Sequence, residues 1–100
     1  MANKLPKSLD PQDTFNKVYR KMHETYDAAE EIYYNADFTL EEKLEVIAHS
    51  SARASGMADM LRELGYEVRN SQGILLPQLV MNKFYALKQR VELDIRRKGA

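Results

Sequence analysis

Two segments of the chain carry apolar residues at alternating spacings of four and three, and no other feature limits the fold as much. In the first segment these positions are Phe15, Tyr19, Met22, Tyr26, Ala29, Tyr33 and Ala36. In the second they are Leu40, Leu44, Ile47, Ala54, Ala58 and Leu61, with the small polar Ser51 at the one remaining position of the series. Such a spacing places every member on one face of an α-helix and is typical of helices that pack lengthwise against each other. We therefore expect two long helices, at about 11–36 and about 40–64.

The residues beside these segments carry the signals that begin and end helices. Asp10 followed by Pro11 is a typical start, since aspartate accepts from the first free amides and proline suits the first turn. Thr39 and Glu42 form a capping box for the second helix, and Gly65 suits the left-handed residue that ends it. So few residues separate the two helices that they should form an antiparallel hairpin.

The last third of the chain predicts a connector and one more helix. Residues 66–76 combine alternating apolar residues with turn residues and a following proline, which indicates an irregular or β-hairpin-like connector. From about Pro77 a helical pattern returns, with apolar residues at Val80, Phe84, Leu87, Val91 and Ile95. The sequence thus predicts an all-α fold: a three-helix up-down-up bundle built on a long antiparallel helical hairpin. We expect residues 1–9 to be a flexible lead-in and residues 10–98 to form a single helical domain.

Composition removes several classes of chemistry. The chain has no cysteine, which excludes disulfides, thiolate metal sites and a thiol nucleophile. No stretch has the roughly 20 apolar residues of a membrane span, and the N-terminal residues lack the apolar segment of a signal peptide. No phosphate-binding glycine loop or nucleophile motif is present, and neither His23 nor His49 has the Glu-x-x-His spacing of bundle metal sites. We expect a soluble, cytoplasmic, non-enzymatic protein with no membrane partner, no cofactor and no metal.

Net charge is zero, but the charges are unevenly distributed. Residues 1–50 carry ten acidic and six basic residues, and residues 51–100 carry five acidic and nine basic residues. In an up-down-up bundle, the basic end of the third helix lies beside the acidic hinge between the first two. We therefore expect Arg90 and the basic residues 96–98 to pair with hinge acids, within one chain or between subunits. Exposed pairs contribute only about 0–1 kcal/mol each, so they argue for a helix register more than for stability.

The first predicted helix carries a row of tyrosines at heptad spacing. Tyrosine suits an interface with one edge near water, because its hydroxyl needs a hydrogen-bond partner. A chain of this length also builds only a thin core and gains from association. We therefore predict an interaction or regulatory module that forms a homodimer and binds a partner protein through helix faces. The predicted binding residues are a tyrosine edge and an acidic patch: Tyr19, Tyr26, Tyr33, Glu30, Glu31, Glu41 and Glu42.

The stretch AHSSARASGMA, residues 48–58, leaves an alternative open. Within one long helix, its small residues let another helix approach closely, which would offset the cost of Gly56, about 1 kcal/mol relative to alanine. As a turn at residues 50–53, it would make residues 40–76 look like a winged helix-turn-helix of a DNA-binding transcriptional regulator. The DNA contacts would then be Arg53, Arg62 and Arg69. The unbroken apolar spacing and the few basic residues favour the single helix, so nucleic acid is not the favoured partner.

Overall fold

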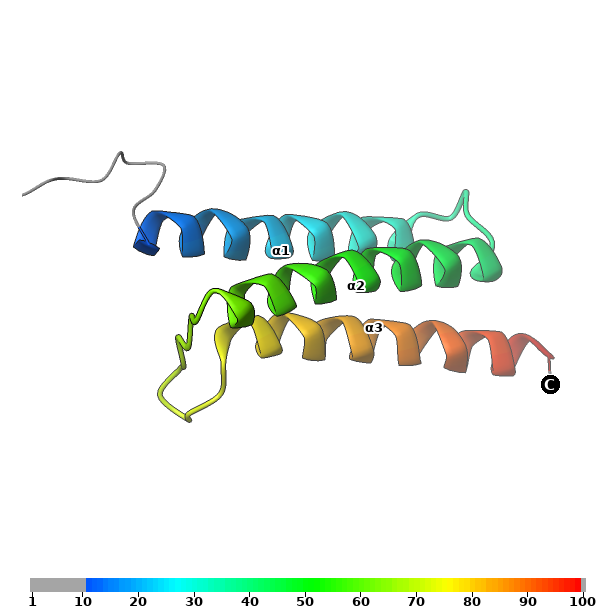
Figure 1. Ribbon diagram of the computed structural model, residues 1–100. Helices are drawn as coiled ribbons and strands as arrows, with labels where there is room; N and C mark the ends of the chain where they lie inside the picture. The colour runs from blue at the N-terminus through cyan, green and yellow to red at the C-terminus, as the bar shows by residue number, and fades with distance from the viewer. Residues whose placement is uncertain (1–10, 100) are drawn as a thin grey trace, which may run out of the picture.

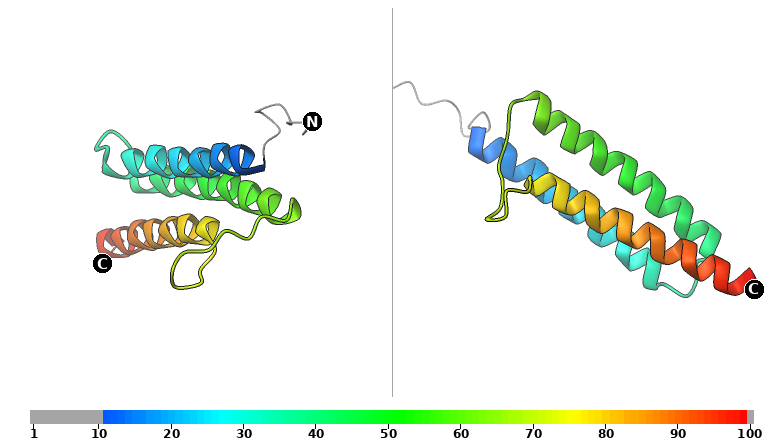
Figure 2. Two further views of the ribbon diagram at one scale, coloured as in Figure 1. Left: turned by 90° about the vertical axis from the view of Figure 1, so that its left-hand side faces the viewer. Right: turned by 90° about the horizontal axis from the view of Figure 1, so that it is seen from below.

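The structure is a computed structural model that describes residues 11–99. It consists of three helices of 24 residues each, α1 (Pro11–Tyr34), α2 (Leu40–Glu63) and α3 (Leu76–Gly99). Successive helices run in opposite directions, so the end of α3 lies at the same end of the molecule as the α1–α2 turn (Figure 1 and Figure 2). Within residues 11–99, no helix combines the length and the apolar character needed to cross a membrane. The predicted all-α three-helix bundle is confirmed.

Local hydrogen bonds hold the turn between α1 and α2. The side-chain oxygen of Asn35 accepts from the Asp37 amide at 2.8 Å, and α1 ends at Tyr34, two residues before the predicted boundary. The capping box then begins α2. The Thr39 hydroxyl accepts from the Glu42 amide at 3.1 Å, and the Glu42 carboxylate accepts from the Thr39 amide at 2.9 Å. These bonds favour the ionised carboxylate and lower the pKa of Glu42.

The end of α2 has the geometry that Gly65 predicts. Gly65 adopts φ +86°, and its amide donates to the Arg62 carbonyl at 3.0 Å. The next amide, that of Tyr66, donates to the Leu61 carbonyl at 3.0 Å, which completes a Schellman motif. The Tyr66 ring then lies 5.6 Å from the ring of Phe15. The end of α2 is therefore tied to the start of α1.

Asn70 organises the remainder of the connector. Its side-chain oxygen accepts from the amides two and four residues further along, at 2.9 Å each. Gly73 closes the turn with φ +80°. One isolated antiparallel bridge joins Arg69 to Leu75, and α3 begins directly after it.

The start of α3 differs by one residue from the prediction. The helix begins at Leu76, and Pro77 lies in its first turn. An amide at that position would have no intrahelical acceptor, so the missing N–H of proline removes no helix bond. The proposed N-cap Asp10 and the proposed lead-in 1–9 lie outside the described residues.

The core runs along the line where the three helices meet. Its buried side chains are Phe15, Met22, Ala29, Ile47, Ala54, Leu61, Val80, Met81, Phe84, Leu87 and Val91. The buried residues of α1 and α2 belong to the predicted apolar faces, and within each helix they are seven residues apart. Each large member contributes about 1.5–3 kcal/mol by leaving water, so this column of side chains is the main source of stability.

The stretch 48–58 belongs to one uninterrupted helix. Helix α2 continues through residues 50–53, so the turn that a helix-turn-helix needs is absent. Ala54 is fully buried in the core, as expected for a closely packed face. The expectation for Gly56 was wrong, because it is exposed and an added Cβ would meet no atom within 4 Å. No neighbour among the described residues offsets the cost of this glycine.

Replacing Gly56 with alanine should therefore raise the free energy of unfolding, by about 0.5–1 kcal/mol. Alanine has the higher helix propensity, and the space around the new Cβ is open. Urea unfolding followed by circular dichroism measures the change. Gly65→Ala is the matched control: its Cβ also meets open space, but the positive φ strains any L side chain, so it should destabilise the protein. A destabilising Gly56→Ala would contradict the open, helical environment of that residue.

Candidate interaction surfaces

Two residues of the tyrosine edge lie between α1 and α3. Tyr26 packs edge-on against the buried ring of Phe84, with centroids 5.2 Å apart, and its hydroxyl donates to Glu30 at 3.0 Å. The Tyr33 hydroxyl donates to Asp94 of α3 at 2.9 Å. Both tyrosines are half-buried. The predicted partner-binding edge thus also has a structural role, because it holds α3 against α1.

Tyr19, the third member of the tyrosine edge, lies nearer the start of α1. Its ring stacks on Phe15 at 5.5 Å and meets His23 edge-on at 4.6 Å. His49 lies exposed on α2. In the part of the chain that the structure describes, no three His, Cys, Asp or Glu residues come together as a metal site.

Arg90 joins the aromatic side chains at the hinge end of the bundle. Its guanidinium lies 5.0 Å from the ring centroid of Tyr33 and 5.9 Å from that of Tyr34. It also donates a hydrogen bond to the Tyr34 hydroxyl at 3.3 Å. The Lys43 ammonium of α2 lies 5.7 Å from the Tyr33 centroid. Each such cation–π contact contributes about 0.5–1 kcal/mol at an exposed site, so cations from α2 and α3 are drawn to the end of α1.

Among the described residues, the expected ion pairs between the end of α3 and the hinge acids are absent. The ion pairs among residues 11–99 are local ones, Lys17 with Asp13 at 3.2 Å and Arg62 with Asp59 at 3.7 Å. The basic and acidic ends do share one end of the molecule (Figure 1). The Arg90 guanidinium, however, contacts the neighbouring tyrosine rings rather than a carboxylate.

A shallow cavity of about 220 Å³ lies beside these rings. It is lined by Tyr33, Arg90, Leu93, Asp94 and Arg97. Tyr34 next to it is 64% exposed, and Leu93 is 45% exposed. We refer to Tyr33, Tyr34, Arg90, Leu93 and Arg97 as the hinge-end surface. It combines aromatic, apolar and cationic groups in one place.

The acidic patch lies at the same end of the molecule. Glu30 and Glu31 belong to the last turns of α1, and Glu41 and Glu42 begin α2. Two of the four have partners within the chain, since Glu30 accepts from Tyr26 and Glu42 completes the capping box. Glu31 and Glu41 are exposed to solvent.

A second surface, which sequence reasoning missed, lies on the outer side of the α1–α2 pair. It is an apolar groove of about 310 Å³ lined by Lys17, Val18, Lys21, Met57 and Met60. We refer to it as the methionine groove. The sequence signal was present in the spacing of Met57, Met60 and Leu64, which fall beside the apolar face of α2 rather than on it.

The arginines proposed as DNA contacts do not form one surface. Arg53 and Arg62 are nine residues apart on α2, which separates them by about 180° around the helix axis. Arg62 pairs with Asp59, and Arg69 in the connector donates to the Gly73 carbonyl at 2.8 Å. A single duplex lying along α2 could not reach all three.

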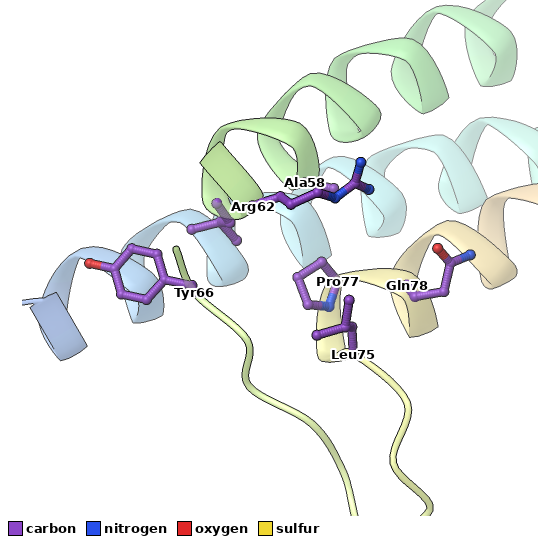
Figure 3. Close-up of a pocket in the computed structure, with 7 residues that line it drawn as sticks. Ala58, Arg62, Tyr66, Leu75, Pro77 and Gln78 are labelled. Atoms are coloured by element: carbon purple, nitrogen blue, oxygen red, sulfur yellow. The ribbon is translucent and has the colours of Figure 1, made fainter. Parts of the chain in front are cut away.

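A small, partly enclosed cavity lies where the connector meets α2 and α3 (Figure 3). Its lining residues are Ala58, Leu61, Arg62, Tyr66, Leu75, Pro77 and Gln78. The volume is about 30 Å³, which is room for a water molecule. This cavity belongs to the packing of the connector.

Comparison with known proteins adds no relative: no protein-family model, no curated protein and no solved structure matches the chain. The hinge-end surface, the acidic patch and the methionine groove are therefore the features from which a function can be argued.

The half-buried tyrosines should make the protein less stable at alkaline pH. Burial, together with the hydrogen bond to Glu30, raises the pKa of Tyr26 to about 12, and burial raises the pKa of Tyr19 and Tyr33. An unfolded tyrosine ionises at about pH 10. As pH rises, these tyrosines therefore lose their protons in the unfolded state before they do so in the folded state. Their contribution to the free energy of unfolding is complete below about pH 10 and is lost as pH rises toward about 12.

Urea midpoints measured across this pH range should fall for the wild-type chain, and Tyr26→Phe should reduce the fall. Tyr85→Phe is the control, because that tyrosine is exposed on α3. If Tyr26→Phe and Tyr85→Phe reduced the fall by the same amount, the environment assigned to Tyr26 would be wrong.

Proposed function

We propose that the protein is a non-enzymatic interaction module that binds a partner protein at the hinge-end surface. The observation that supports this most is the exposed Tyr34 ring beside Arg90 and the exposed Leu93. Tyrosine and arginine are enriched among the residues that dominate binding energy at protein interfaces. An aromatic ring of this exposure on a short chain is a natural anchor for another protein.

The contacts within the chain prepare this surface for binding. The hydrogen bond from Tyr33 to Asp94 fixes α1 relative to α3, and Arg90 lies against both neighbouring rings. The hydrogen bond with Tyr34 also raises the pKa of Arg90, whose guanidinium is charged at neutral pH in any case. Side chains that are already ordered lose less conformational entropy when a partner binds.

The charges around the surface indicate the chemistry of the partner. Arg90 and Arg97 attract an acidic group, and Leu93 with Tyr34 suits an apolar side chain next to it. Glu31 and Glu41 at the same end of the molecule attract basic groups. A partner segment with an apolar residue between an acidic and a basic group would complement this end of the bundle.

We place this module in the cytoplasm, since a chain without cysteine suits a reducing compartment. Of the tyrosine edge, Tyr33 belongs to the proposed binding surface, while Tyr19 and Tyr26 lie nearer the start of α1. The separation of the candidate DNA-binding arginines gives the transcription-regulator alternative no support.

A comparative pull-down from the native host tests the proposal. The wild-type chain should retain a partner protein that the double variant Tyr34→Ala, Arg90→Ala does not. We expect at least a tenfold loss of affinity, because truncation of an anchor residue costs about 2 kcal/mol or more.

The matched control is Tyr85→Ala, which removes another exposed tyrosine, about 140° around α3 from Arg90. It should bind as the wild type does, and circular dichroism should show both variants folded. Retention of the same partner by the double variant, or failure of the wild type to retain any protein, would contradict the proposed function.

A further inference from the structure

Methionine supplies all the sulfur in this chain. The sequence contains five methionines and no cysteine. A cysteine thiolate would react with a peroxide before any thioether does, and here no thiolate competes. A peroxide that meets this protein therefore acts on methionine, and the fold determines which methionine it reaches.

The methionines of residues 11–99 differ in their access to solvent. Met22 is fully buried and Met81 is 4% exposed, and both belong to the core. Met57 is half-buried and packs against the core. Met60 is 42% exposed and belongs neither to the core cluster nor to the side chains packed against it. Access therefore decreases from Met60 to Met57 and then to the two core methionines.

The methionine groove leaves the Met60 side chain open to small solutes. Met57 and Met60 are three residues apart, so they lie on one face of α2. The remainder of the groove wall is formed by Lys17, Val18 and Lys21 of α1. The groove volume of about 310 Å³ is several times the 30 Å³ or so of a water molecule. Hydrogen peroxide, which is only slightly larger than water, therefore fits into the groove.

The reaction balances with hydrogen peroxide as its only co-reactant. A lone pair of the Met60 sulfur attacks one oxygen of the peroxide, so that an S–O bond forms and the O–O bond breaks. The sulfur is oxidised by two electrons, and the peroxide is reduced. The departing hydroxide takes the proton of the transferred hydroxyl group and leaves as water. The products are one methionine sulfoxide and one water molecule.

The added oxygen changes the groove more than it changes the fold. A sulfoxide is polar and accepts hydrogen bonds, whereas the thioether that it replaces is apolar. At Met60 the new oxygen meets water, and the ammonium groups of Lys17 and Lys21 lie on the same groove as donors. In the core the same oxygen would be buried among apolar side chains, which is costly. Met22 and Met81 therefore react only when the chain unfolds.

We propose that Met60 is an oxidation site of the folded protein, at which a peroxide converts the methionine groove from an apolar surface to a polar one. Met57 reacts more slowly in the same groove, because its side chain packs against the core. Met60 lies near the end of α2 that is away from the hinge (Figure 1). This inference therefore does not depend on the partner site proposed at the hinge-end surface.

Peptide mapping by mass spectrometry tests the order of oxidation in the full chain treated with dilute hydrogen peroxide. Sulfoxide should form at Met60 at least about tenfold faster than at Met22 and Met81, with Met57 between them, since the rate follows exposure. In concentrated urea the four rates should become equal within about twofold, because no methionine is then protected. Equal rates in the folded chain would overturn the proposal, as would protection of Met60 by a second copy in the predicted homodimer.

The fluorescence of 8-anilino-1-naphthalenesulfonate tests the change in the groove. This apolar, anionic dye suits an apolar groove beside two lysines, and peroxide treatment of the wild type should lower its fluorescence at least about twofold. The double variant Met57→Leu, Met60→Leu has no sulfur in the groove, so its signal should not fall. The matched control Met22→Leu, Met81→Leu keeps both groove sulfurs and should respond as the wild type does. An unchanged wild-type signal, or an equal fall in both double variants, would overturn the proposal.

Urea unfolding followed by circular dichroism tests whether the fold survives the oxidation. The chain that carries one sulfoxide, at Met60, should keep its helical signal and unfold within about 10% of the urea midpoint of the untreated chain. The reason is that Met60 lies outside the core. Loss of the helical signal, or a larger fall of the midpoint, would show that Met60 is not a surface site and would overturn the proposal.

Discussion

The burial of α2 between its two neighbours is the interaction on which the rest of the structure depends. Ile47, Ala54 and Leu61 form one stripe of α2 that is removed from water by side chains of α1 and α3. A chain of this length has room for one column of core residues. The side chains of α1 and α3 that complete this column therefore pack around the α2 stripe. The capping box at Thr39 fixes where α2 begins after α1, and the Schellman motif at Gly65 fixes where it ends before the connector to α3.

The two sides of α1 have different surroundings. On one side Tyr26 and Tyr33 contact α3, and their hydroxyls are bonded within the chain. On the other side the row from Val18 to Ile32 lies beside α2 and is open to solvent at the methionine groove. The first side leads to the hinge-end surface, and the second carries the methionine groove. The proposed partner site lies on the first of these sides.

The sequence was sufficient for the helices because their signals are local. Apolar spacing, the capping box and Gly65 each act within a few residues, so they predict the same structure whatever the rest of the chain does. The open space at Gly56 and the contacts of Arg90 depend on where a third helix lies, and spacing within one helix does not contain that information. The methionine groove was missed for a different reason: Met57 and Met60 fall beside the predicted apolar face of α2, and the sequence reasoning followed only the face itself.

Native-state hydrogen exchange followed by NMR is the measurement that tests the central claim most directly. If α2 is one continuous helix at the centre of the bundle, amides 50–53 should exchange only through global unfolding, at the same free energy as those of Ile47 and Leu61. Fast exchange confined to residues 50–53 would show a turn in the middle of α2. It would contradict the continuous central helix on which this account of the bundle depends.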